Sequence, residues 1–118
     1  MKYKIHQIRL NKLERAIVNE KGHEALDKQV RKLDMDFADD HEIKKLVNES
    51  WNAGDYDYVA DITADTLNQV FHIGNMDIPR EENMYINDKA GMYSVSIGDI
   101  IETDEAKHVV ASYGFIKI

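Results

Sequence analysis

The clearest alternation of hydrophobic and polar residues lies near the C-terminal end of the chain. Between residues 93 and 97, Ser94 and Ser96 alternate with aliphatic residues, so the two serines share one face of a predicted strand. The Gly98-Asp99 pair predicts a turn, and a second apolar run follows it. The pattern therefore predicts strands over Tyr93–Ile97, Asp99–Thr103 and Lys107–Ile118.

Two segments further upstream have the same period of two. In Lys2–Leu10, Tyr3 and Ile5 alternate with charged residues, which is typical of a strand. In Tyr56–Ile62, aromatic and apolar residues occupy every second position. Both segments are therefore predicted to join the C-terminal strands in one sheet.

Helical spacing of apolar residues dominates the region between these two strands. Asn11, with Glu14 three residues later, predicts a capping box at the start of a helix that Gly22 ends or interrupts. A second helical stripe follows and extends to Leu33. A third helix, capped by Asp39 or Asp40, is predicted to end at Ala53-Gly54. A short fourth helix, capped by Thr63 or Asp65, should follow the strand Tyr56–Ile62.

Periodicity is lost between residues 76 and 91, which predicts the longest loop of the chain. Helices and strands are otherwise segregated along the sequence, and this favours an α+β fold over a doubly wound one. We predict a single domain, residues 1–118, in which an antiparallel sheet of about five strands has two to four helices packed on one face.

Composition narrows the classes of function. The 118 residues are 43% hydrophobic and 31% charged, as in ordinary globular domains, and the absence of cysteine excludes disulfides and thiolate chemistry. A net charge of −7 opposes contact with phosphate backbones, so we expect no direct nucleic-acid binding; a partner with a basic surface, or simple solubility, suits this charge. No apolar run is long enough to cross a bilayer and no secretory signal is visible, so we predict no membrane partner and a cytoplasmic location.

No arrangement of reactive side chains indicates catalysis. The five histidines lie singly, without the spacing of a metal site, and Ser94 and Ser96 lack a nucleophile-elbow pattern. Calcium binding is one interpretation of the acidic cluster, but a solvated connection with a helix cap explains the same residues and is preferred. This cluster consists of Asp34, Asp36, Asp39, Asp40 and Glu42. We therefore predict a protein that is not an enzyme and has no cofactor or metal ion.

The candidate contact residues are aromatic and polar side chains near predicted turns and loops. Trp51 and Tyr56 flank Gly54, and aromatic residues with a polar tip are enriched at interfaces although they also fill cores. Arg80 and Tyr85 of the predicted loop, and Ser94 and Ser96 of the predicted strand, are the other candidates. The predicted interaction residues are Trp51, Tyr56, Arg80, Tyr85, Ser94 and Ser96.

The run from Tyr93 to Ile101, followed by a short insert and a closing segment from Val110 to Phe115, resembles the YodL-like domain family of phages and mobile elements. Residues 3–8, 58–62 and 67–75 are also similar to segments of that family. The resemblance implies a phage or mobile-element accessory protein, and it implies no established activity.

Two hypotheses for the function follow. The leading one is an accessory protein that binds a host macromolecule, most simply a host protein, with counter-defence as its most concrete form. The alternative is a protein that binds and sequesters a small nucleotide-like signal, as a homo-oligomer in which lysine and arginine side chains converge on phosphates.

Overall fold

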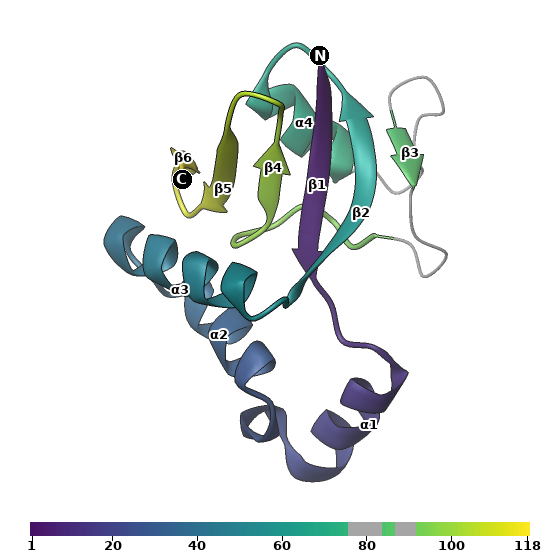
Figure 1. Ribbon diagram of the computed structural model, residues 1–118, viewed down its shortest axis with the longest axis vertical. Coiled ribbons are helices and arrows are strands. Elements are labelled where there is room, and N and C mark those ends of the chain that lie inside the picture. Colours follow the sequence, from purple (N-terminus) through teal and green to yellow (C-terminus); the bar gives the residue numbers. More distant parts are fainter. Residues whose placement is uncertain (76–83, 87–91) are drawn as a thin grey trace.

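The computed structural model describes residues 1–75, 84–86 and 92–118, and Figure 1 shows their arrangement. The helices are α1 (Lys12–Lys21), α2 (Asp27–Met35), α3 (Asp40–Asn52) and α4 (Leu67–Gly74), with a short 3₁₀ helix, η1 (His23–Ala25), between α1 and α2. The strands are β1 (Lys2–Ile8), β2 (Tyr56–Thr63), β3 (Met84–Ile86), β4 (Ile100–Glu102), β5 (Lys107–Ala111) and β6 (Gly114–Lys117).

These strands form one six-stranded sheet in the order β3-β2-β1-β4-β5-β6. Every neighbouring pair is antiparallel. The first strand of the chain, β1, lies between β2 and β4 at the centre of the sheet (Figure 1). The sheet therefore joins the N-terminal strand to the C-terminal hairpin, and the helical region between β1 and β2 is a single excursion from it.

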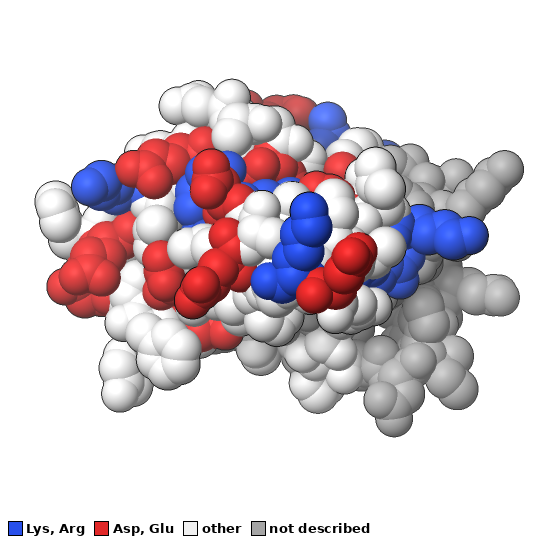
Figure 2. All heavy atoms as spheres, turned by 90° about the horizontal axis from the view of Figure 1, so that it is seen from below, with Lys and Arg blue, Asp and Glu red and all other residues white. Residues whose placement is uncertain are grey.

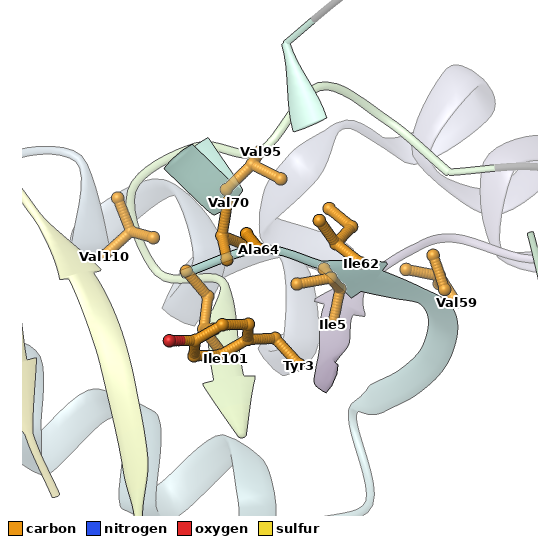
Figure 3. Close-up of a cluster of buried hydrophobic side chains, with 10 residues drawn as sticks. Tyr3, Ile5, Val59, Ile62, Ala64, Val70, Val95, Ile101 and Val110 are labelled. Carbon is orange, nitrogen blue, oxygen red and sulfur yellow. The ribbon is translucent and has the colours of Figure 1, made fainter. Parts of the chain in front are cut away.

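Both faces of the sheet bury apolar side chains. On one face, Ile101 belongs to a buried cluster that includes Val70 of α4, and Figure 3 shows these side chains together. On the other face, Ile100 belongs to a second cluster that includes Val47 of α3. Because successive residues of a strand point to opposite faces, α4 covers one face, while α2 and α3 pack on the other.

The α+β class and the antiparallel sheet that the sequence predicts are confirmed. The helix α4 adds a layer on the face opposite to α2 and α3. The helix α1 contacts η1 and is joined to α2 by an ion pair between Glu14 and Lys28, whose charged atoms are 3.0 Å apart. No helix among residues 1–75, 84–86 and 92–118 is long and apolar enough to cross a membrane.

Local signals account for the helix boundaries. The Asn11 side chain accepts a hydrogen bond from the backbone of Glu14, whose carboxylate accepts one from the backbone of Asn11, so the capping box is confirmed. Asp39 caps α3 with its side chain. The predicted cap of α4, Thr63 or Asp65, is wrong. The cap is Thr66, because β2 continues through Thr63 and delays the start of the helix.

Three predictions about strands need correction. The segment Lys107–Ile118 forms two strands, β5 and β6, which make a hairpin with its turn at Ser112 and Tyr113. Within the predicted loop, Met84–Ile86 forms the edge strand β3, which pairs with β2; the other residues of this loop lie outside the described residues. The third correction concerns Tyr93–Ile97, which is not a strand.

This segment crosses from one face of the sheet to the other. Val95 is buried in the cluster on the α4 face, whereas Ile97 packs against the cluster on the α2–α3 face. In a regular strand, residues two positions apart point to the same face, but Val95 and Ile97 point to different faces. The strand that the alternation of the sequence predicts is therefore wrong. Ser94 and Ser96 are both exposed in the observed conformation.

The side chain of Gln7 holds this crossing segment. Its amide nitrogen donates hydrogen bonds to the carbonyl of Tyr93 and to Oδ2 of Asp99, each 2.9 Å long, and its oxygen accepts one from the amide of Tyr93. The same Asp99 oxygen accepts a hydrogen bond from the backbone of Ser96. Burial raises the pKa of Asp99 to about 7, although these hydrogen bonds and the charge of Lys32 act in the opposite direction.

The turn before β4 requires glycine at position 98. Gly98 has a φ of +91°, in the left-handed region that residues with a side chain rarely adopt. A Cβ at this position would lie 2.6 Å from the sulfur of Met35, which is completely buried. The carbonyl of Gly98 also accepts a 2.6 Å hydrogen bond from the hydroxyl of Tyr56. Gly98 is therefore a point where the turn, α2 and β2 meet.

Candidate interaction surfaces

No helix of the described residues covers one half of the sheet's α2–α3 face. In Figure 1 no helix lies in front of the upper half of β1, β2 and β4. Charged residues of four neighbouring strands lie here: Lys2, Lys4, Asp61, Glu102 and Lys107. We call this area the open sheet face.

Opposite charges alternate across the open sheet face. Asp61 of β2 lies opposite Lys4 of β1, which lies opposite Glu102 of β4, which in turn lies opposite Lys107 of β5. Directly paired residues of antiparallel strands point to the same face, so these four side chains form one row perpendicular to the strands. The row has the charges −, +, −, + in the order β2, β1, β4, β5.

A group of aromatic rings borders this row on the side of α3. The His6 ring lies 5.1 Å from the Trp51 ring and 5.6 Å from the Tyr58 ring, measured between centroids. The Lys107 ammonium lies 4.0 Å from the centroid of the Trp51 ring, a favourable cation–π distance. His6 Nε2 is 3.0 Å from Glu102, yet burial lowers the pKa of His6, outweighing this carboxylate.

A cavity of about 340 Å³ opens on the same face. It is lined by Lys2, Lys4, Glu102, Thr103 and Asp104. Two ammonium groups thus face two carboxylates, so the lining has no excess of positive charge. A polyphosphate requires converging cations, and this mixed lining does not provide them.

A second exposed surface lies at the turn between α2 and α3. The side chain of Phe37 is 91% exposed there, and four aspartates around it in sequence are exposed as well. We call this surface the acidic turn; its residues are Asp34, Asp36, Phe37, Asp39 and Asp40. Figure 2 shows acidic side chains gathered, with some basic ones among them, at the side of the molecule where Figure 1 has α2 and α3.

The charges of the acidic turn are mostly unused by the fold. Asp39 caps α3, but Asp34, Asp36 and Asp40 form no ion pair within the described part of the chain. Among the described residues, no group of three or more histidine, aspartate or glutamate side chains is arranged to hold a metal ion.

The structure separates the predicted interaction residues. Trp51 is partly exposed and stands at the border of the open sheet face, 5.8 Å from the Tyr56 ring between centroids. Tyr56 has a structural role, because its hydroxyl bonds to Gly98 and burial raises its pKa. Ser94 and Ser96 are exposed on the crossing segment and belong to no strand.

The remaining two predicted residues belong to the predicted loop. The backbone of Tyr85 lies in β3, opposite Asp61 of β2. Arg80 lies outside the described residues.

Sequence reasoning missed both surfaces as contact sites. The row of the open sheet face joins residues from four strands, so only the strand register reveals it. Phe37 had a detectable signal, since it is an aromatic residue within an acidic, turn-like segment, but the sequence does not show whether another element covers it.

Comparison of the chain with protein-family models, with curated proteins and with solved structures finds no match. The resemblance to YodL-like domains therefore stays a prediction, and the two surfaces themselves carry the functional argument.

Proposed function

We propose that this chain is a non-enzymatic accessory protein of a phage or mobile element that acts by binding a host protein through the acidic turn. The observation that carries the proposal is the 91% exposure of Phe37. Burying a phenylalanine side chain contributes about 1.5–3 kcal/mol. The fold leaves this contribution unused, so it is available for binding.

The surroundings of Phe37 determine the chemistry of the partner. Contact energy concentrates in a few aromatic anchors, and the charges around them select partners and accelerate association. Phe37 is the anchor, and Asp34, Asp36 and Asp40, which form no ion pair with any described residue, flank it in sequence. The partner surface should therefore have an apolar pocket bordered by lysine and arginine. Proteins that recognise nucleic acid have such basic surfaces, which makes counter-defence the most concrete form of the function.

The sequestration of a nucleotide-like signal receives less support. The cavity on the open sheet face has a suitable size, but Glu102 and Asp104 would lie against the phosphates. We therefore place binding of a host protein first.

Site-specific photo-crosslinking tests the proposal. Phe37 is replaced by p-benzoylphenylalanine, which preserves the aromatic ring, and the protein is irradiated in bacterial host cells. The matched control carries the same group at Tyr113, an equally exposed aromatic residue (101%) at the tip of the β5–β6 hairpin. We expect one discrete adduct from position 37 that position 113 does not form.

The adduct is then identified by mass spectrometry and the partner is purified. Binding of this partner should weaken at least about tenfold in Phe37→Ala and in Asp36→Lys, and should not change in Tyr113→Ala. Equal adducts from both positions, or unchanged affinity of Phe37→Ala, would show that the acidic turn is not the binding surface.

A further inference from the structure

We propose that the open sheet face is a self-complementary surface that binds a second copy of this chain, with a two-fold axis parallel to the strands. The inference is independent of the proposed function, because it concerns a different surface. It rests on the order of charges across the sheet.

A two-fold axis parallel to the strands, between β1 and β4, reverses the row of charges in the second copy. Lys4 then faces Glu102 of the partner subunit, and Asp61 faces Lys107 of the partner subunit. The row −, +, −, + meets +, −, +, −, so every charge faces an opposite one. The outer Asp61 is only 9% exposed and lies 3.5 Å from Lys2 of its own chain, so the two central Lys4–Glu102 contacts carry the complementarity. The strand spacing of about 4.8 Å is the same in both copies, so the charges coincide along the whole row.

The neighbouring residues continue this complementarity. Lys2 precedes Lys4 by two positions on β1, and Asp104 follows Glu102 by two positions after β4, so both lie one step further along the same two chains. Under the same axis, Lys2 faces Asp104 of the partner subunit. These four residues line the cavity of about 340 Å³, which thus lies at the axis and has room for the long side chains of the second copy.

Of the two central charges, Lys4 is exposed, and Glu102 is partly exposed and contacts His6 of its own chain at 3.0 Å. Among the described residues Lys4 forms no ion pair; its ammonium lies 5.8 Å from the centroid of the Tyr58 ring. The contact between Glu102 and Lys107 within one chain is long, at 3.9 Å. Trp51, partly exposed beside Lys107, adds an apolar border to the row.

The small size of the surface determines the expected strength. A standard interface covers about 800 Å² on each partner, and the uncovered parts of four short strands offer less. We therefore expect a transient dimer with a dissociation constant between ~10 µM and ~1 mM, weakened by added salt.

The test uses two charge-reversed variants, Lys4→Glu and Glu102→Lys, in sedimentation equilibrium at low salt. Each variant alone places like charges opposite each other at the axis, so its dissociation constant should rise at least about tenfold. In an equal mixture, Glu at position 4 faces Lys at position 102, and the two remaining native residues also match. The mixture should therefore form a heterodimer that neither variant forms alone.

Controls separate this result from a loss of folding or a general charge effect. Lys117→Glu changes an exposed lysine of the same sheet that points to the opposite face, and it should dimerise like the wild type. Circular dichroism checks each variant; if Glu102→Lys unfolds because His6 loses its partner, Lys2→Glu with Asp104→Lys replaces the pair. A wild type that stays monomeric up to ~1 mM, or folded variants whose mixture stays monomeric, would refute the proposal.

Discussion

Substitution of Gly98 by valine should destabilise the protein more than any change in the exposed residues next to it. Gly98 has a φ of +91°, which is unfavourable for a β-branched residue. The new Cβ would also lie 2.6 Å from the sulfur of Met35, whose side chain is completely buried. Two separate costs therefore apply at the same position.

The structure allows a rough magnitude. Backbone strain of this kind costs about 1–3 kcal/mol, and forcing extra methyl groups into a packed site costs about 1–3 kcal/mol more. We expect Gly98→Val to lower the free energy of unfolding by about 2–6 kcal/mol, a large part of the ~5–15 kcal/mol that a domain of this size has. Gly98→Ala in a Met35→Ala background removes the steric cost and should retain the backbone strain.

Urea unfolding followed by circular dichroism measures these values. The matched control is Ser96→Ala, since Ser96 is exposed and only its backbone takes part in the turn, so this change should stay within about 0.5 kcal/mol. Equal midpoints for Gly98→Val and Ser96→Ala would refute the reasoning. If Gly98→Ala costs as much free energy of unfolding in the Met35→Ala background as in the wild type, the steric contact with α2 is unimportant.

Two further predictions concern the same turn. Tyr56→Phe removes the hydrogen bond to the Gly98 carbonyl and should lower the free energy of unfolding, measured by urea titration, by about 1 kcal/mol. An unchanged free energy of unfolding would show that the hydroxyl does not stabilise the fold. Asp99→Asn tests the raised pKa: the folded chain binds a proton below pH of about 7, while the unfolded carboxyl does so only below about 4, so wild-type stability should rise as the pH falls between these values. The stability of wild type relative to Asp99→Asn should therefore be greater at pH 5 than at pH 8, and a difference that does not vary with pH would contradict the burial of the charge.

The starts of α1 and α3 and the central strands could be predicted from the sequence because their signals are local. The capping box of Asn11 and Glu14 needs only residues within one turn, and Asp39 caps α3 in the same way. The period of two identified β1 and most of β2, since each strand has one strongly apolar face. The turn at Gly98 also follows from its own residues.

Only the tertiary structure decided where the alternation at Tyr93–Ile97 leads. Val95 and Ile97 satisfy a strand pattern, but they enter different clusters because Gln7, distant in sequence, fixes the backbone of the segment. The pairing of β3 with β2 was missed for the same reason: a partner strand supplies its hydrogen bonds, and its own three residues carry too weak a pattern.

The surfaces on which the functional proposals rest depend on tertiary structure most strongly. The alternating charges of the open sheet face exist only once the register places Lys4 between Asp61 and Glu102. The exposure of Phe37 depends on which elements cover the turn between α2 and α3. Local hydrogen bonds and periodicity thus determined where α1, α3, β1 and β2 begin, whereas contacts between residues distant in sequence decided which side chains remain free to bind.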